Sequence, residues 1–307
     1  MNIAHLQLFV RIASTQNISA AGEELGLSPA VSSAHINKLE STLGVRLLHR
    51  TTRSVSLTEE GKAFLHHAED VLDSVEAAKA SVGAGSTSPA GTLRITAPAS
   101  FGRMHLLPAL QLFMQEFPRL TVDLKLSDTI IDLVEGGFDI AIRNSELKDS
   151  SLIARKLVND RRVLCASPEY LQRNGEPKQP DDLKHHCCIV LSGMDTWHFK
   201  TENGERALKV NGTFKTDNGE AIRDACRMGI GITVNSTWSA YEELAQGKLV
   251  EVLPTFPLVS HTAIWAVYPS SRLLAPKVRA FIDFCSDYFS GVPYWEKALT
   301  ENVNTQQ

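Results

Sequence analysis

Short hydrogen-bonding side chains are concentrated near the start of the sequence, in the run from Ser28 to Lys38 (SPAVSSAHINK). Hydroxyl and amide groups can bond to base edges or phosphates, and small methyl groups can contact thymine. A helix that carries such groups on one outward face is suited to enter a groove of double-stranded DNA. An ordinary surface helix can have the same composition, so the residues alone leave both interpretations open.

Two short helices joined by a tight turn are predicted around this run. Ser19 is expected to cap the first helix, which continues to Leu25, and Gly26 supplies the left-handed residue that ends it. Ser28 is expected to cap the second helix, which has a proline at its first position, and Gly44 closes that helix. This spacing predicts a helix–turn–helix, a motif that also occurs in bundles without DNA.

The second helix is predicted to have two different faces. Ser32, Ile36, Leu39 and Leu43 recur at steps of four, three and four, which indicates a buried face. The opposite face carries small or polar groups that can approach DNA closely. The candidate DNA-contacting residues of the helix pair are Ser19, Ser28, Ala30, Ser33, Ala34, His35, Asn37 and Lys38.

A basic segment follows the helix pair. Two β-prone runs, 45–48 and 54–57, flank a turn, which predicts a hairpin, or wing, beside the second helix. A solvated loop is the alternative. Arg50 and Arg53 are expected to pair with phosphates or to enter a minor groove. The predicted turn holds His49, Arg50, Thr51, Thr52 and Arg53, of which Arg50, Thr52 and Arg53 are candidate DNA contacts.

A long helix is predicted from Thr58, its cap, to about Val82, with Glu59 and Glu60 in the first turn. Apolar and small residues recur along it in a heptad pattern, which favours pairing with a second copy of the chain. Burial against the chain's own body is the alternative. Residues 83–91 (GAGSTSPAG) then read as a flexible hinge. The heptad seam comprises Gly61, Phe64, Ala68, Val71, Val75, Ala78 and Val82.

Composition sets further bounds on this chain of 307 residues. Its net charge is −4, so any affinity for DNA must come from a local patch rather than from the whole molecule. We find no secretory signal and no apolar stretch that approaches a membrane span, and we therefore expect a cytoplasmic protein with no membrane partner. Five scattered cysteines without a C-x-x-C motif suggest reduced thiols, with Cys226 as the candidate for redox sensing.

No metal or cofactor site is predicted. The run 185–188 (HHCC) is tempting, but four adjacent residues cannot surround one tetrahedral ion without extreme strain, because neighbours in a strand point to opposite faces. We find no catalytic motif of the nucleophile-elbow, zinc-protease, P-loop or dinucleotide-binding kind. An enzyme using a cleft is therefore the weaker interpretation, and no catalytic residue is assigned.

The rest of the chain alternates strands with helices, which predicts mostly parallel, covered sheets. The chain is expected to cross into a second lobe near residue 161 and to return near 265. Strands are predicted at 93–97, 121–126, 139–143, 162–167, 187–191, 230–234 and 263–267, and helices at 106–117, 130–135, 219–228, 237–246 and 276–289.

Ligands of such folds bind between lobes, at the carboxyl ends of strands. Ser100, Asp128 and Asn218 lie at such ends, although each can simply cap a helix. Arg143 and the helix that begins near Ala99 hint at an anionic group in the ligand. The residues that the rule selects are Pro98, Ala99, Ser100, Phe101, Asp128, Thr129, Arg143, Asp217, Asn218, Thr233 and Val234.

The run AAGEELGLSPAVSSAHINKLESTLGVRLLHRTTRSVSLTEEG (20–61) resembles the winged helix–turn–helix of LysR-type transcriptional regulators. The long helix and hinge are similar to the linker of that family. The remainder, from TLRITAPASFG to PKVRAFIDF, resembles its effector-binding domain. One position departs from the family pattern: Ala34 stands where members usually carry Arg or Lys, so one DNA contact is missing or has moved to His35 or Lys38.

The resemblance implies an α/β fold: an N-terminal winged helix–turn–helix, a long linker helix and a C-terminal, two-lobed α/β domain like periplasmic binding proteins. It implies a regulator of transcription that binds promoter DNA and a small-molecule effector, with DNA bending or spacing changed by the effector. A homodimer through the linker helix and a homotetramer, as a dimer of dimers, are also implied. The predicted boundaries are 1–58, 59–82, 83–91 and 92–307, with lobe I at 92–161 and 266–300 and lobe II at 162–265.

Within the family pattern, Ser100, Thr129, Asn218 and Thr233 are the favoured effector contacts, with Phe101, Asp128 and Arg143 as further candidates. A solute-binding protein of a transporter would share the two lobes. The head module and the lack of an export signal oppose that alternative.

Overall fold

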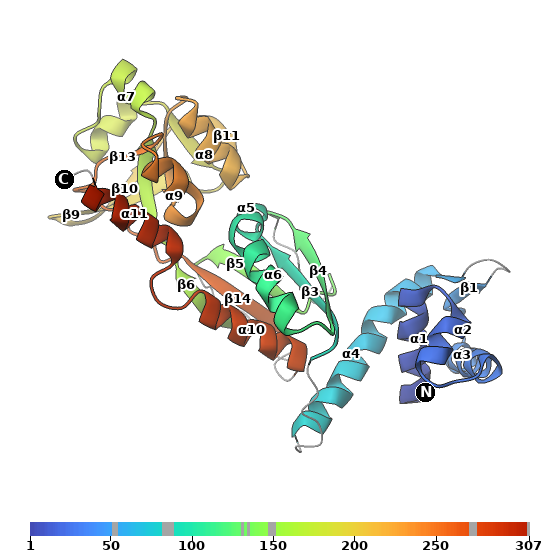
Figure 1. Cartoon of the computed structure of the whole chain (residues 1–307). Helices are drawn as coiled ribbons and strands as arrows, with labels where there is room; N and C mark the ends of the chain where they lie inside the picture. The colour runs from blue at the N-terminus through green and yellow to red at the C-terminus, as the bar shows by residue number, and fades with distance from the viewer. Residues whose placement is uncertain are drawn as a thin grey trace. The chain divides into compact units, whose positions relative to one another are not determined.

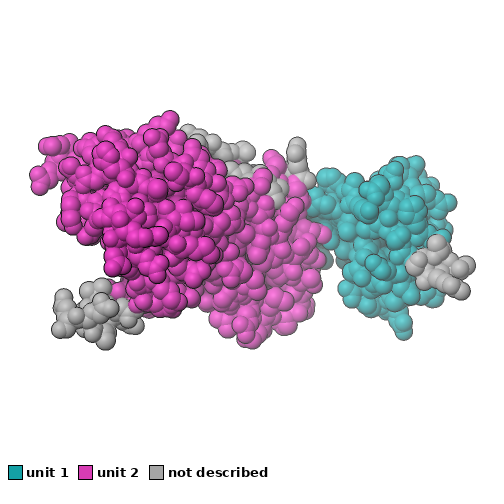
Figure 2. Space-filling view, turned by 90° about the horizontal axis from the view of Figure 1, so that it is seen from above, with its two compact units in different colours: residues 1–88, 274–276 teal, residues 89–273, 277–307 magenta. Residues whose placement is uncertain are grey.

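The computed structural model describes residues 1–50, 55–81, 89–129, 132–133, 136–146, 152–269 and 275–305. The chain divides into two compact units, coloured separately in Figure 2. Unit 1 comprises residues 1–88 and 274–276, and unit 2 comprises 89–273 and 277–307. Within the described ranges, no helix has the length and apolar character needed to cross a membrane.

Unit 1 is a helical head with a small hairpin (Figure 1). The first helix, α1, contacts the other three helices of the unit, and a core containing Leu6, Phe9, Ile36 and Leu39 fills the space between them. The elements are α1 (Ile3–Thr15), α2 (Ile18–Glu24), α3 (Pro29–Leu43), β1 (Leu48–Arg50), β2 (Val55–Leu57) and α4 (Glu59–Ser81). The predicted helix–turn–helix is therefore confirmed as α2 and α3.

Local capping chemistry explains most of these boundaries. Gly26 and Gly44 have positive φ angles of 69° and 74°, as a helix end that turns left-handed requires. The hydroxyl of Ser28 accepts a hydrogen bond from the backbone of α3, as predicted. The prediction that Ser19 caps α2 is wrong: Asn17 is the cap, and its side-chain oxygen accepts a bond from the Ser19 N–H at 2.9 Å.

The helix α3 has the two faces that the sequence predicted. Ser32, Ile36 and Leu39 are buried, whereas Leu43 is half-buried at the end of the helix. Close packing against α2 depends on a glycine, because a Cβ atom at Gly22 would lie 2.1 Å from the Ser32 hydroxyl. These contacts fix which face of α3 is buried and which face is exposed.

The hairpin forms two to three residues later than predicted on its first strand. The predicted run 45–48 is mostly the exit from α3, and β1 begins at Leu48 and pairs with β2 through Leu57. His49 and Arg50 therefore belong to a strand and not to the turn. The reason is a buried carboxylate, Glu40, which accepts the backbone N–H groups of Leu47 and Leu48 and holds this exit against α3.

The helix α4 begins as predicted, with the Thr58 hydroxyl accepting the N–H of Gly61 at 2.9 Å. The heptad seam divides into two parts. Its first part, including Gly61 and Ala68, is buried in the core of unit 1, which is the alternative that the sequence left open. In the second part Val71 and Ala78 are exposed. Val82, the last predicted seam residue, and most of the predicted hinge lie outside the described residues.

Unit 2 contains two five-stranded sheets, one in each lobe, which confirms the two-lobed α/β fold. The order of the first sheet is β4-β3-β5-β14-β6, and that of the second is β11-β8-β12-β7-β13. The first lobe is built from β3 (Gly91–Ala97), α5 (Ala99–Phe101), a π-helix η1 (Gly102–Leu106), α6 (Leu107–Glu116), β4 (Leu120–Leu126), β5 (Ile140–Ser145), β6 (Leu152–Asn159), β14 (Ala263–Pro269) and α10 (Pro276–Tyr288).

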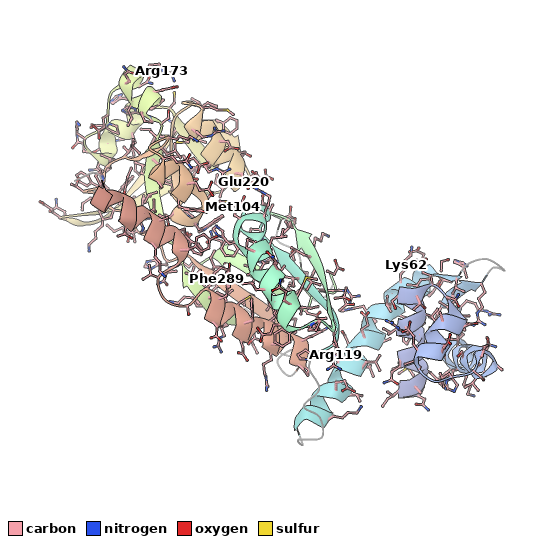
Figure 3. All side chains as sticks on the ribbon, in the orientation of Figure 1. Lys62, Met104, Arg119, Arg173, Glu220 and Phe289 are labelled. Atoms are coloured by element: carbon pink, nitrogen blue, oxygen red, sulfur yellow. The ribbon has the colours of Figure 1, made fainter. Side chains whose placement is uncertain are left out.

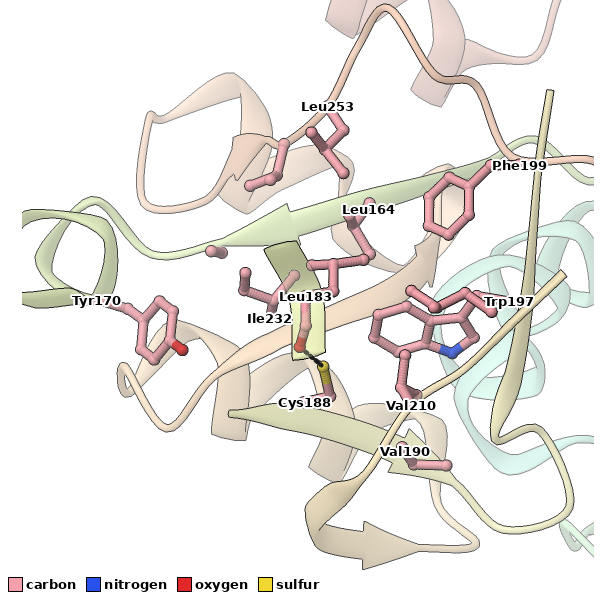
Figure 4. Close-up of a cluster of buried hydrophobic side chains, with 13 residues drawn as sticks. Leu164, Tyr170, Leu183, Cys188, Val190, Trp197, Phe199, Val210, Ile232 and Leu253 are labelled. Atoms are coloured by element: carbon pink, nitrogen blue, oxygen red, sulfur yellow. Dashed lines mark hydrogen bonds between the residues drawn. The ribbon is translucent and has the colours of Figure 1, made fainter. Parts of the chain in front are cut away.

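The second lobe surrounds its own apolar core. Figure 4 shows Trp197 and Phe199, which alternate along one strand, beside Leu164 and Ile232. Its elements are β7 (Arg162–Ala166), α7 (Pro168–Asn174), a 3-10 helix η2 (Pro180–His185), β8 (Cys188–Leu191), β9 (Thr196–Thr201), β10 (Gly204–Lys209), β11 (Gly212–Thr216), α8 (Gly219–Arg227), β12 (Ile232–Ser236), α9 (Thr237–Ala245) and β13 (Val250–Glu251).

Three predictions about this unit need correction. The sheets are mixed, not mostly parallel: β14 runs antiparallel to both β5 and β6, and β7 runs antiparallel to both β12 and β13. The chain re-enters the first lobe at Ala263, because all of β14 pairs within that sheet. The predicted lobe I segment 266–300 also fails at its end, since α11 (Tyr294–Thr305) packs against α9 of the second lobe.

The predicted helix at 130–135 lies largely outside the described residues, and its described members, Asp132 and Leu133, are not helical. Gly91, predicted as part of the hinge, begins β3 instead.

The two passages of the chain between the lobes lie side by side. The Asp160 N–H donates to the Thr262 carbonyl at 3.3 Å, and the Thr262 hydroxyl donates back to the Asp160 carboxylate at 2.8 Å. The Arg162 guanidinium donates to the same carboxylate at 3.2 Å. The Asp160 side chain is fully buried, so this carboxylate joins both passages at one point.

Candidate functional site

The outward face of α3 carries the small and polar groups that the sequence analysis selected. Ala30, Ala34, Asn37 and Lys38 are exposed, and Ser33 is half-buried. Ser19, in the first turn of α2, and Ser28, the cap of α3, are exposed as well. A face of this composition admits close approach to DNA without a like-charge penalty.

His35 is only partly directed outward. It is half-buried, and its ring centroid lies 4.6 Å from that of His5 in α1. Burial, followed by the charge of His35, lowers the pKa of His5. His35 is thus less accessible than an Arg or Lys at position 34 would be expected to be, whereas Lys38 is exposed.

Arg50 is bound to α3 through its side chain. Its guanidinium donates to Glu40 at 2.9 Å, and only 5% of the Glu40 side chain is exposed. Arg46, which was not among the predicted contacts, approaches the same carboxylate at 3.4 Å, but 76% of its side chain is exposed. The sequence signal for these contacts was Glu40, an acidic residue one turn before the end of α3. Thr51, Thr52 and Arg53 lie outside the described residues.

Between the two lobes of unit 2 lies a cavity of about 500 Å3. Ser100, Asp128 and Thr233, three of the predicted effector contacts, line it, together with Pro98, Asp217 and Val234 from the wider set selected by the strand-end rule. This is the size of a small-molecule site. Figure 3 labels Met104 of the first lobe and Glu220 of the second on the sides of the lobes that face each other. Glu220 forms an ion pair across the cleft with Arg103, the residue before Met104.

Four other predicted contacts do not line this cavity. Phe101 is fully buried, with its ring edge-on to Trp238 at 5.3 Å. Thr129 is exposed beyond the end of β4. Arg143 lies inside β5 and not at its end, so its neighbour Asn144 faces the cavity in its place. Burial lowers the pKa of Arg143.

The fourth, Asn218, is the cap of α8, with its side-chain oxygen accepting the Ala221 N–H at 2.9 Å. Its amide also donates to Asp128 across the cleft at 2.9 Å. The other oxygen of the Asp128 carboxylate accepts the Ala99 N–H at 2.9 Å. The helix end that seemed available for an anion is therefore already occupied by an acidic residue of the protein.

The inner part of the cavity contains unsatisfied hydroxyl groups. The oxygens of Ser100 and Ser239 are buried and have no hydrogen-bond partner among the described residues. In contrast, the Thr233 hydroxyl donates to the Ile189 carbonyl at 2.8 Å, and β12 continues past it to Ser236. Buried polar groups without partners are costly, so the two serines mark a place where a ligand can complete the bonding.

Several lining residues were not predicted from the sequence. Asn144 and Glu146 belong to the first lobe, and His198 and Glu205 come from the hairpin of β9 and β10. The Nδ1 atom of His198 lies 2.6 Å from Glu205. Nothing in the local sequence marks this hairpin as part of a site, because only its pairing brings it to the cleft.

A buried histidine connects the lobes behind the cavity. The Nε2 atom of His105 in η1 donates to the Trp238 carbonyl at 3.0 Å, and in the neutral ring its Nδ1 atom accepts from the Tyr294 hydroxyl at 2.5 Å. Burial lowers the pKa of His105 to about 4. The ring is therefore neutral at pH 7, and this contact is a structural link.

Cys226 is a buried thiol, and the HHCC run (185–188) joins the end of η2 to the start of β8. The Cys226 thiol donates to the Cys165 carbonyl at 3.3 Å, and its interaction with the Cys165 side chain and its burial raise the pKa of Cys226. A raised pKa opposes the thiolate that redox sensing needs. Within the described ranges, no three His, Cys, Asp or Glu side chains are grouped so that they could hold a metal ion.

Comparison with known proteins agrees with this arrangement. Residues 3–62 match the family model described as the bacterial regulatory helix-turn-helix protein, lysR family, and residues 86–290 match that of the LysR substrate binding domain. The transcriptional regulator DmlR of Escherichia coli K12 is 37% identical over 289 residues, which cover 93% of this chain and 94% of DmlR. The transcriptional activator TtdR of the same strain is 36% identical, with 91% of each chain covered.

Solved structures give the same result. CrgA, a LysR-type transcriptional regulator from Neisseria meningitidis, superposes with a TM-score of 0.62 at 32% identity, covering 95% of this chain and all of that one. The Vibrio cholerae virulence activator AphB gives a TM-score of 0.59 at 27% identity, with 94% and 100% covered. These curated relatives are named as transcriptional regulators or activators and not as enzymes. The chain belongs to the LysR family of transcriptional regulators, with a helix-turn-helix domain that binds DNA and a two-lobed domain that binds an effector.

Proposed function

We propose that this regulator reads promoter DNA with the outward face of α3 and contacts phosphates with the hairpin that follows it. The observation that carries the proposal is the division of α3 into a buried apolar face and an exposed face of short, mostly uncharged groups. The proposed DNA contacts are Ser19, Ser28, Ala30, Ser33, Ala34, His35, Asn37, Lys38, Arg50, Thr52 and Arg53.

A gel-shift titration with promoter DNA tests this proposal. Ser33→Glu places a negative charge on the face that would meet phosphates, and we expect it to abolish binding while circular dichroism shows an intact fold. Ser41→Glu makes the same change about two turns further along α3, at an exposed position outside the proposed contacts, and serves as the control. Equal affinity of both variants and the unmodified protein would remove α3 from the interface.

We further propose that two copies pair through the part of α4 that the head leaves uncovered. Val71 and Ala78 are exposed there and lie one heptad apart, and Val75 is half-buried between them. Pairing would place two recognition helices on successive major grooves, about 34 Å apart. Val71→Asp should then give monomers in analytical ultracentrifugation. Dimers that persist in this variant would exclude the seam.

The interlobe cavity is the proposed effector site, with Ser100, Asp128 and Thr233 among its contacts. Binding there would favour one arrangement of the lobes, and through the packing of protomers it would change the bend and spacing imposed on DNA. An effector acts in this way only if it binds the two arrangements with different affinity. A tetramer built from two dimers and a cytoplasmic location remain predictions that rest on the resemblance and on the sequence.

Footprinting and circularly permuted promoter fragments test the regulatory part. We expect protection over two successive major grooves and a bend angle that changes when a cavity ligand is added. A footprint of one turn would contradict paired heads. A bend angle unchanged at saturating ligand would contradict the proposed coupling.

A further inference from the structure

The effector cavity has a strongly negative lining. Four carboxylates face it: Asp128 and Glu146 from the first lobe, and Glu205 and Asp217 from the second. Glu146 and Asp217 have no hydrogen-bond or ion-pair partner among the described residues, so no described cation neutralises either charge. A cleft lined by charges of one sign concentrates the opposite ion.

The two arginines and the histidine of the hairpin near the cavity are already engaged. Arg162 is the one Lys or Arg among the described lining residues, and its guanidinium bonds to the fully buried carboxylate of Asp160. Arg103, at the cleft, pairs with Glu220. His198, the nearest titratable base in the hairpin, bonds to Glu205. An incoming anion would therefore find neither arginine unoccupied, and the further basic residue of the lining is His261, an exposed imidazole.

The helix ends at the cavity are occupied in the same way. Asp128 accepts the Ala99 N–H at the start of α5, and Asn218 accepts the Ala221 N–H in the first turn of α8. Asp217, one residue before the cap, adds a second negative charge at that end of α8. Both groups reduce the attraction that these helix termini would otherwise have for an anionic ligand.

The cavity lining combines unpartnered hydroxyl groups with apolar walls, which suits a ligand with a polar group on an apolar body. The unpartnered hydroxyls of Ser100 and Ser239 belong to residues only 2% and 4% exposed, and both residues line the cavity. Apolar walls come from Ile189, Ile222 and Trp238. The hydroxyls can accept from an ammonium N–H as well as donate, so they do not require an acidic ligand.

We infer that the effector of this regulator is an organic cation, a small amine on an apolar skeleton, bound between the acidic walls of the interlobe cavity. This inference rests on the proposed function, in which the cavity is the effector site. It replaces the anionic group suggested by the sequence, whose two supports are both weakened: Arg143 does not line the cavity, and Asp128 occupies the helix end at Ala99. A carboxylate ligand would lose its hydration beside four like charges, whereas an ammonium group would gain charged partners.

A matched ligand panel tests the inference on the full chain. Aliphatic and aromatic primary amines, each paired with the carboxylate of the same carbon skeleton (3-phenylpropylamine with 3-phenylpropionate, for example), are added during thermal unfolding. Amines should raise the melting temperature because they bind the folded state, and their carboxylate partners should not. Asp217→Asn and Glu146→Gln should each weaken amine binding about tenfold or more, the usual size of a charged hydrogen bond.

Two further variants separate the possible failures. Glu202→Gln removes an exposed carboxylate outside the cavity and should leave amine affinity unchanged. Gly219→Leu should fill the cavity, because a Cβ atom there meets only the Ser100 hydroxyl, at 3.8 Å. The inferred charge would be wrong if carboxylates stabilised the unmodified protein and Gly219→Leu abolished that effect. It would also be wrong if no amine stabilised the protein. Stabilisation that survives Gly219→Leu would instead overturn the cavity as the effector site.

Discussion

Glu40 is expected to hold the hairpin of β1 and β2 against α3, and replacing it with alanine is a direct test. One carboxylate oxygen accepts the N–H groups of Leu47 and Leu48 at 2.8 and 3.1 Å, and the other accepts from Arg50 at 2.9 Å. Alanine would leave two buried backbone donors without partners. It would also release the Arg50 guanidinium, which the Glu40 carboxylate now holds.

The expected cost follows from these bonds. A hydrogen bond to a charged group contributes about 1.5–3 kcal/mol, and an unsatisfied buried donor costs about 1–3 kcal/mol. Since the effects of neighbouring bonds overlap, we expect Glu40→Ala to lower the free energy of unfolding of unit 1 by about 3–5 kcal/mol. That is a large part of the stability of a typical small domain.

Hydrogen exchange is the appropriate assay. The four tryptophans of the chain, at 197, 238, 265 and 295, all belong to unit 2, so their fluorescence does not report on the head. Amide hydrogen exchange of a peptide covering residues 45–50 reports directly on the head. A loss of 3–5 kcal/mol predicts exchange about a hundredfold faster or more, and gel-shift affinity should fall with it.

A matched control distinguishes this claim from a general loss of charge. Glu24 of α2 pairs with Arg11 at the surface, with 44% of its side chain exposed, so Glu24→Ala should cost less than about 1 kcal/mol. Glu40→Gln, which keeps one acceptor oxygen, should fall between the two. If the Glu40 and Glu24 alanine variants exchange at the same rate, the reasoning about the buried carboxylate is wrong.

Three further substitutions test the cores of the two units. Burial holds the pKa of His105 at about 4, below its unfolded value of 6.5. Between these two pH values the unfolded chain binds more protons than the folded chain. The free energy of unfolding therefore falls as the pH is lowered from 6.5 towards 4, by about 3 kcal/mol in total. His105→Gln should remove this part of the pH dependence in urea titrations, and an unchanged difference between pH 7 and pH 4 would contradict it. The Lys277 ammonium lies 3.0 Å from the equally buried carboxylate of Asp139. Lys277→Met removes this cation and should lower the free energy of unfolding by about 3–5 kcal/mol, and the double variant with Asp139→Asn should recover most of that loss. Equal stability of the single and double variants would refute the pairing. Gly61→Ala places a Cβ atom 2.1 Å from the Leu47 carbonyl and should destabilise the head by about 1–3 kcal/mol, measured by the same hydrogen exchange.

What the sequence could predict was set by local chemistry. Gly26, Ser28 and Thr58 were assigned correctly because each acts on backbone groups within a few residues, and the relevant pattern is contained in one turn. The cap of α2 was missed by two residues because Asn17 and Ser19 are both competent caps, and only the geometry of the preceding turn decides between them.

The site was predicted less completely because it is assembled from distant segments. Position at a strand end located Ser100, Asp128 and Thr233, but it could not tell whether Arg143 or Asn144 faces the cleft, because β5 ends two residues later than predicted. Glu205 reaches the cavity only through the pairing of β9 with β10. The mixed sheets were missed for the same reason, since strand direction depends on the crossings between lobes.

The joint made by Asp160 and Thr262 restricts how the effector domain can move. Two backbone passages that share one buried carboxylate cannot slide past each other without breaking its bonds. A relative motion of the lobes that keeps these bonds must therefore turn about this carboxylate. A rotation of a few degrees at such a pivot grows into a larger displacement with distance from it, so a small molecule seated beside the pivot can move the outer ends of the lobes.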